Sequence, residues 1–406
     1  MTEPPLEELL RALSPQVLVA LLRRYGADQF DTCEDAVQEA LLAAFQQWPR
    51  SGRPTEPRAW LITAARRRLV DRIRSDSSRR EREKADATLS RPISDAPSTW
   101  VDDSVQLLQL CCHPALSVSS QITLTLRAVA GLSTAQIAHA YLLPEATIAQ
   151  RISRAKARIR EAGVSSSGPL GARDRLDPML AVIYVMFSEG HTATAGEAIN
   201  DIDVTDQAIH LARMLRSAVP DDGEVAGLLA LLLLTDARRP ARTSASGKLV
   251  ALDEQDRSLW DRGLIDEGTE ILAETLPRRP AGPYALQAAI AALHDEAPNA
   301  AATDWAQILA LFRLLERQTN NPVVTMNAAV AEAMVFGPSA GLASIDRLLG
   351  TGRPLDAHRV SSVRAHLLEL DGRVQEAIAE YTAAARSTAS TPERDYLITR
   401  AHRLKR

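Results

Sequence analysis

Three segments near the start of the chain repeat their hydrophobic residues at helical spacing, which predicts three amphipathic helices. The stripe of residues 34–48 consists of Val37, Ala40, Leu41, Ala44 and Trp48. The stripe of residues 57–74 consists of Leu61, Ile62, Ala65, Leu69 and Ile73. The stripe of residues 145–160 consists of Ile148, Ile152, Ala155 and Ile159. No segment shows a convincing strand alternation with hairpin turns, so the chain is predicted to be all-α.

The third helix completes a helix-turn-helix. Residues 133–138 predict a short helix that begins at a Ser or Thr N-cap. Pro144 separates it from the next helix, because proline disfavours helical geometry at the residue before it and suits the first turn of a new helix. The other face of that next helix is mostly polar or basic, which is typical of a helix that reads duplex DNA. The candidate DNA contacts on it are Ala146, Thr147, Gln150, Arg151, Arg154, Lys156 and Arg158.

These candidates differ in the contact that their chemistry allows. Gln150 and Arg154 carry donors and acceptors that match base edges in the major groove. Ala146 and Thr147 lie near the helix N-terminus, where they can contact bases, thymine methyl groups or phosphate. Arg158 lies farther along the helix and is expected only to neutralise the DNA backbone.

The remaining pattern divides the chain into five parts. Residues 1–78 form a first helical module, residues 79–103 a linker rich in charge, Ser, Asp and Pro, and residues 104–163 the helix-turn-helix module. Residues 164–172 form a second linker, and residues 173–406 a long succession of Ala- and Leu-rich helices. Within this last part, residues 372–384 match the second half of a tetratricopeptide unit, and residues 325–349 are a weaker partner.

Charge and composition narrow the function classes. The chain has 406 residues, too many for one ordinary domain, and 24% of them are charged, as in folded soluble proteins. Residues 1–165 hold 22 Lys and Arg against 19 Asp and Glu, a net +3, whereas the remainder holds 25 against 32, a net −7. A basic front and an acidic back suit a nucleic-acid binder that carries a non-binding module. The apolar run Val225–Thr235 is too short to span a membrane and predicts a buried helix, and Met1–Pro5 does not have the pattern of a signal peptide.

The three cysteines predict no disulfide framework. Cys111-Cys112-His113 could indicate metal binding or redox sensing, but no second Cys/His pair lies nearby. A structural role as small, partly buried residues before the Pro114 turn is the favoured interpretation. No metal site and no cofactor are therefore expected.

The polar faces of the first two helices each allow two interpretations. Residues 34–48 present Asp35, Gln38, Glu39 and Gln46 around Leu42, which is either a docking spot for a partner protein or a stray apolar residue. Residues 57–74 present Trp60, Arg67, Asp71 and Arg74, with Arg66 at the margin. This face suits stacking and charge neutralisation on single-stranded nucleic acid, or is a solvated basic face with Trp60 packed at a domain edge.

The order of these elements resembles the extracytoplasmic-function sigma factors of bacterial RNA polymerase. The resemblance covers the whole front part of the chain. The matching residues are Asp35–Ala40, Pro57–Leu61 with Ala65–Asp71, and Ile148–Lys156.

This resemblance implies a promoter-recognition subunit that performs no chemistry. Asp35, Gln38, Glu39, Leu42 and Gln46 would bind core polymerase, whose beta-prime clamp and beta flap are the implied contacts. The helix that carries Trp60, Arg66, Arg67, Asp71 and Arg74 would open and read the promoter element just upstream of the start site. The residue 145–160 helix would read the more distant element. Many of these sigma factors have Asn where Arg67 stands, so the promoter-base specificity stays open.

The chain also resembles the subgroup with a long C-terminal helical extension that ends in tetratricopeptide-like repeats. This match is carried by Cys111–Leu116, Leu143–Thr147, Ile183–Gly190 and Asp236–Arg242. It implies that the extension acts in cis on sigma activity without the usual membrane anti-sigma factor. A cytoplasmic protein is expected, and a regulatory protein or a ligand on the extension remains open.

Two other functions compete with this one. In the first, the chain is a one-component DNA-binding transcriptional regulator whose repeat domain senses a ligand or peptide. In the second, an enzyme is fused to a DNA-binding module, and Asp236–Arg242, Asp253–Arg257 and Glu189-Gly190-His191 are its best candidate site. Ion pairing at helix ends explains the same charges, and no nucleotide loop, zinc-protease helix or nucleophile elbow is present.

Overall fold

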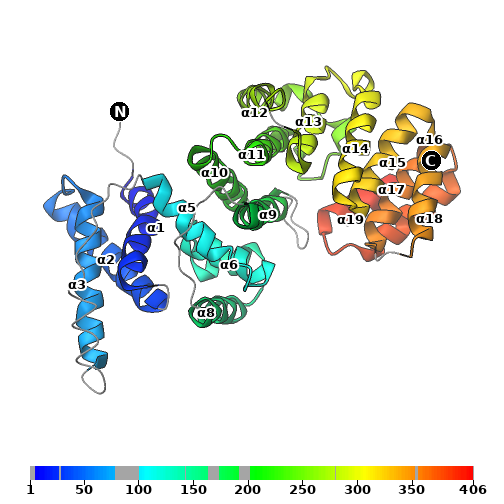
Figure 1. Cartoon of the computed structure of the whole chain (residues 1–406). Helices are drawn as coiled ribbons and strands as arrows, with labels where there is room; N and C mark the ends of the chain where they lie inside the picture. The colour runs from blue at the N-terminus through cyan, green and yellow to red at the C-terminus, as the bar shows by residue number, and fades with distance from the viewer. Residues whose placement is uncertain are drawn as a thin grey trace. The chain divides into compact units, whose positions relative to one another are not determined.

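The structure, a computed structural model, describes residues 5–26, 29–77, 100–141, 143–162, 173–191, 202–278, 280–352 and 355–405. Helices dominate these residues, and the only strand-like pairing among them is an isolated bridge between Thr243 and Leu249. The all-α prediction is therefore confirmed. The chain forms two compact units, Met1–Val185 and Met186–Arg406 (Figure 1).

The front unit contains both predicted groups of helices. The first group is α1 (Leu6–Tyr25), α2 (Phe30–Ser51) and α3 (Pro57–Ser77). The second group is α5 (Trp100–Cys111), α6 (Val118–Ala128), α7 (Thr134–Ala140) and α8 (Glu145–Glu161). The two groups contact each other, because α5 packs against α1 and α2 contacts α8. The helix α9 (Arg173–His191) runs across the boundary between the units.

Local sequence signals fix several helix ends in the front unit. Gly52 has a positive φ of 83° and its N–H donates to the carbonyl of Trp48, which ends α2. Ser117 caps α6 by accepting a hydrogen bond from the N–H of Ser120. Residues 78–99 and 163–172, which hold most of both predicted linkers, lie outside the described residues, and α5 already begins at Trp100. The predicted domain boundaries stay predictions.

The back unit is a succession of helices, with a longer connection between α11 and α12 that contains three short 3-10 helices. Its helices after α9 are α10 (Ile202–Ala218), α11 (Gly223–Asp236), α12 (Arg262–Thr275), α13 (Pro283–Glu296), α14 (Trp305–Thr319), α15 (Pro322–Phe336), α16 (Pro338–Gly350), α17 (Ala357–Leu370), α18 (Val374–Ser387) and α19 (Thr391–Arg403). Every residue from Val225 to Leu234 in α11 is buried, which confirms the predicted buried helix. No helix among the described residues is long and apolar enough to cross a membrane.

Two antiparallel helix pairs near the C-terminus have the close packing that the repeat-like sequence predicts. The pair α17 and α18 turns at Gly372, whose φ is 73°, and buries Ala377, Tyr381 and Ala384. The pair α15 and α16 corresponds to the weaker partner at residues 325–349. A Cβ atom on Gly341 would lie 2.5 Å from the carbonyl oxygen of Ala329, so only glycine allows this approach.

Candidate nucleic-acid interface

The helix-turn-helix is built as the sequence predicts. Ser133 begins α7 with reciprocal hydrogen bonds: its Oγ accepts from the N–H of Gln136 at 3.1 Å, and its own N–H donates to Gln136 Oε1 at 2.8 Å. Pro144 is the N-cap of α8 rather than its first helical residue, and has an extended ψ of 139°. Ile148, Ile152, Ala155 and Ile159 are all buried, so the opposite face of α8 is turned outward.

That outward face carries most of the predicted DNA contacts. The exposed residues among them are Ala146, Thr147, Gln150, Arg154 and Arg158. Arg151 is partly buried. With Glu145 as the only acidic residue in the first turn and Arg158 and Arg160 in the last, the helix presents hydrogen-bonding groups near its start and positive charge near its end. This arrangement can place polar groups in a groove while the arginines face phosphates.

Lys156, which the sequence predicts as a DNA contact, is engaged by α2 in this structure and is not part of the exposed face. Its side chain is only 11% exposed, and its Nζ pairs with both Glu34 and Asp31 of α2, the second at 3.0 Å. The ammonium also lies 5.5 Å from the centre of the Phe30 ring. Burial lowers the pKa of Lys156, but the two carboxylates outweigh it and the net pKa is raised. The helical spacing placed Lys156 at the edge of the basic face and could not show that α2 covers this edge.

The polar face of α2 is exposed along its length. Asp35, Gln38, Glu39, Leu42 and Gln46 all lie on the surface, and Leu42 is 56% exposed. Sequence reasoning missed Phe45, which is 48% exposed and lies three residues after Leu42, on the same side of the helix. Its position outside the buried stripe was the signal that could have found it. Two neighbouring exposed apolar side chains make a stray residue a weaker explanation of Leu42.

The acidic residues of this face are paired with arginines of α3. Arg68 Nη1 donates to Glu39 Oε2 at 2.9 Å, and Arg72 Nη1 lies 3.0 Å from Asp35 Oδ2. All four side chains are between about 40% and 55% exposed, so the pairs contribute little to stability. The carboxylates remain accessible to a partner that offers competing cations.

The α3 face combines solvated charge with a packed tryptophan. Arg66, Arg67 and Asp71 are exposed, whereas Trp60 is partly buried and meets Trp48 edge-on with ring centres 5.4 Å apart. Trp60 therefore has features of both predicted alternatives, because one edge packs in the module while part of the ring stays accessible. The side chains of Ile73 and Arg74 lie outside the described residues.

The cysteines lie in the interior of the front unit. Cys33, Cys111 and Cys112 are free and buried. Burial raises the pKa of Cys112 to about 12, and it raises the pKa of Cys111 together with the neighbouring Cys112 and Glu34. The Cys111 and Cys112 thiols are therefore neutral at physiological pH, as structural residues are. No His, Cys, Asp and Glu group that could hold a metal is found in the described part of the chain.

The charged stretch of the back unit forms ion pairs at helix ends. Asp236, at the end of α11, pairs with Arg239 at 3.0 Å, and Arg238 donates to Asp295 of α13 at 2.7 Å. His191 lies 3.9 Å from Asp236 and stacks on Phe187, and burial lowers its pKa. The acids and arginines are thus directed at one another.

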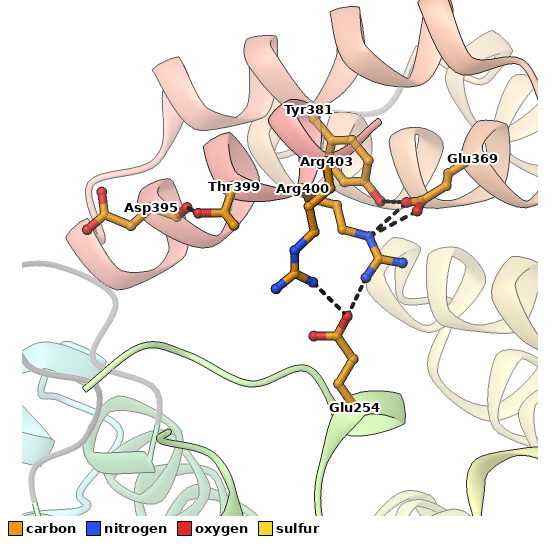
Figure 2. A network of polar contacts seen from close by, with 7 residues as sticks. All are labelled: Glu254, Glu369, Tyr381, Asp395, Thr399, Arg400 and Arg403. Atoms are coloured by element: carbon orange, nitrogen blue, oxygen red, sulfur yellow. Dashed lines mark hydrogen bonds and ion pairs between the residues drawn. The ribbon is translucent and has the colours of Figure 1, made fainter. Parts of the chain in front are cut away.

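Glu254, in the loop after α11, forms ion pairs with a helix that is distant in sequence, as Figure 2 shows. Glu254 accepts hydrogen bonds from Arg400 Nη1 at 2.6 Å and Arg403 Nη1 at 3.3 Å, both on α19. Arg400 Nε also donates to Glu369 Oε2 at 3.0 Å, and the Tyr381 hydroxyl donates to the same carboxylate at 2.6 Å. This network ties the loop after α11 to the last helix pairs, and its geometry matches the ion-pair alternative to an enzyme site.

Comparisons with known proteins identify families for two parts of the chain. Residues 9–79 match the family model for sigma-70 region 2, and residues 175–276 match a family of unknown function, DUF6596. An uncharacterized protein of Rhizobium meliloti (strain 1021) is 39% identical over 395 residues, which cover 94% of this chain and 92% of that protein. No solved structure matches the chain.

Two named relatives match a smaller share of the chain. The ECF RNA polymerase sigma factor SigK of Mycobacterium sp. (strain KMS) is 32% identical over 141 residues, 34% of this chain and 69% of that protein. The protein named "Probable ECF RNA polymerase sigma factor SigI" of Mycobacterium tuberculosis (strain ATCC 25618 / H37Rv) is 32% identical over 159 residues, 37% of this chain and 53% of that protein. The region 2 model covers α1–α3, and the helix-turn-helix follows on α7 and α8. The chain therefore belongs to the extracytoplasmic-function (ECF) family of RNA polymerase sigma factors, and carries a long C-terminal helical extension.

Proposed function

We propose that this protein is a cytoplasmic sigma subunit that binds core RNA polymerase and directs initiation at promoters with two recognition elements. The exposed face of α2 docks on the beta-prime clamp, and the helix-turn-helix module lies at the beta flap. The α3 face opens and reads the element nearer the start site, and α8 reads the more distant one. The protein positions and melts DNA and performs no chemistry of its own.

The observation that carries this proposal is the exposed face of α2. A DNA-binding regulator without a polymerase partner needs α2 only for packing, and its outward positions would then be uniformly polar. Instead, Leu42 and Phe45 lie beside each other at 56% and 48% exposure, framed by Asp35, Gln38, Glu39 and Gln46. An apolar centre with a polar and acidic rim is the usual anatomy of a protein-protein interface.

The α8 face supports the DNA-binding part of the proposal. Its exposed residues Gln150 and Arg154 can read base edges, and Arg158 can neutralise phosphate. Because core polymerase would hold the subunit on the promoter, this helix need not bind tightly by itself.

The extension is proposed to regulate sigma activity in cis. It forms a compact unit of its own and makes up more than half of the chain. The relative from Rhizobium meliloti matches 94% of the chain, so both parts also occur together there. Transcription from a cognate promoter, with and without residues 173–406, measures whether the extension inhibits or supports sigma activity.

A pull-down with core polymerase tests the proposal. We expect the wild-type chain to bind core and Leu42→Asp to lose binding, because a carboxylate replaces the apolar centre of the interface. Leu349→Asp is the matched control, since Leu349 is 45% exposed on α16, outside the two modules proposed to bind polymerase. If the wild-type chain binds promoter DNA but no core, the one-component regulator replaces the sigma subunit as the function.

A further inference from the structure

A buried ion cluster joins the region 2 helices to the DNA-reading helix. Glu34 of α2 has only 9% of its side chain exposed and receives a cation from each of two other helices. Arg127 of α6 donates through Nε to Glu34 Oε1 at 2.9 Å. Lys156 of α8 binds the other carboxylate oxygen and also Asp31, one turn earlier in α2.

We propose that Glu34, Arg127 and Lys156, with Asp31, form a latch that holds the two promoter-binding modules together in the free protein and opens when the subunit engages polymerase and promoter. The latch joins α2, which ends at Ser51, to α6 and α8, which begin at Val118 and Glu145. It is the charged part of the contact between α2 and α8.

The energetics of the cluster suit a device that opens. Taking charges out of water costs about as much as their mutual attraction returns, so a buried ion cluster adds little net stability to the closed state. When the modules separate, water solvates all four charged groups again. The closed arrangement therefore has a specific geometry, but opening it costs little free energy. An apolar contact of the same size would not have this property, because its exposure to water is always unfavourable.

The position of the latch links it to core binding. This step rests on the proposed function. Asp31 and Glu34 lie one turn from Asp35 and Gln38 on α2, so a partner that docks on the α2 face approaches the carboxylates that hold Lys156. The two promoter elements are separate stretches of DNA, and the modules that read them must take positions that the DNA sets. A latch that fixes α8 on α2 opposes this adjustment until core polymerase competes with it.

Energy transfer between two dyes on the full chain tests the latch without polymerase or DNA. Cysteines introduced for Gln47 and Glu161, both exposed, report the distance between α2 and α8, while the native cysteines are buried and unreactive. In Glu34→Gln, we expect the ratio of open to closed molecules to rise about fivefold or more, because a buried amide cannot balance two cations. Glu56→Gln, an exposed isosteric change in the same module, is the control and keeps the wild-type ratio.

A second variant guards against a simple folding defect. Lys156→Met keeps a long side chain and removes the cation that α8 contributes to the latch, while Glu34 keeps Arg127 as a partner and is not left as an unpaired buried charge. It should also lower energy transfer, and circular dichroism should show wild-type helix content. Wild-type energy transfer in both variants, or loss of helix content in both, would overturn the latch. The proposed function fails separately, in the core pull-down of the unlabelled wild-type chain.

Discussion

The exposed pair Leu42 and Phe45 gives the sharpest quantitative test of how this protein binds polymerase. Replacing both by Ser removes the apolar centre of the α2 face and keeps its acidic rim. Full burial of such side chains stabilises by about 1.5–3 kcal/mol each. Because 56% of Leu42 and 48% of Phe45 remain exposed, docking can still bury about half of each. The pair should therefore contribute about 1.5–3 kcal/mol to core binding, or roughly a 10- to 150-fold change in affinity.

Fluorescence anisotropy of the labelled chain, titrated with core polymerase, measures this difference directly. Leu349→Ser is the control, because Leu349 is similarly exposed, at 45%, on α16 of the back unit. Thermal unfolding should be unchanged in both proteins, since substitutions at exposed positions usually shift stability by less than about 0.5 kcal/mol. A loss of affinity below threefold in the double variant, or an equal loss in Leu349→Ser, would refute the assignment of this face.

Three further outcomes are expected. Ile152→Asp should unfold the front unit, because it buries an unpaired charge at a position 6% exposed, whereas exposed Arg154→Ala should keep the melting temperature and weaken promoter binding roughly 5- to 100-fold in a gel-shift titration. Burial and two nearby arginines lower the pKa of His294 from 6.5 to about 4, so the back unit should lose up to about 2 kcal/mol between pH 7 and 5, as the unfolded chain takes up a proton that the folded chain refuses. His294→Gln should abolish that part of the loss in denaturant titrations at both pH values. Gly341→Ala should cost about 1–3 kcal/mol by urea unfolding because its methyl group meets α15, whereas Gly350→Ala, with open space around it, should not destabilise the same helix.

Much of the candidate site could be predicted from periodicity, because an exposed helix face is set by residues close in sequence. The stripe Ile148, Ile152, Ala155 and Ile159 is buried as predicted, and this fixes which residues of α8 point outward. The Ser133 cap follows from three neighbouring residues for the same reason. Phe45 on α2 was not predicted, because the interpretation of that face rested on its charged and amide residues and on Leu42.

Contacts between segments far apart in the sequence cannot be predicted from the periodicity of hydrophobic residues. The sequence alone does not show that Trp60 packs against Trp48. Nor does it show that the acids and arginines of the back unit pair with one another, as Arg238 does with Asp295 and Glu254 with Arg400. A charge in a sequence carries no information about which distant charge it meets, because pairing depends on how helices far apart in the chain pack.

The sequence by itself determined the helices, their buried faces, the helix-turn-helix and the resemblance to a family, since these depend on local spacing and composition. Only the tertiary structure decided which polar residues remain available for a partner. Lys156 is the clearest case: its place on α8 suggests a DNA contact, but folding brings α2 over it and pairs it with Glu34. The physical reason is that burial and electrostatic pairing are properties of the packed chain, and the helical repeat of one segment cannot specify them.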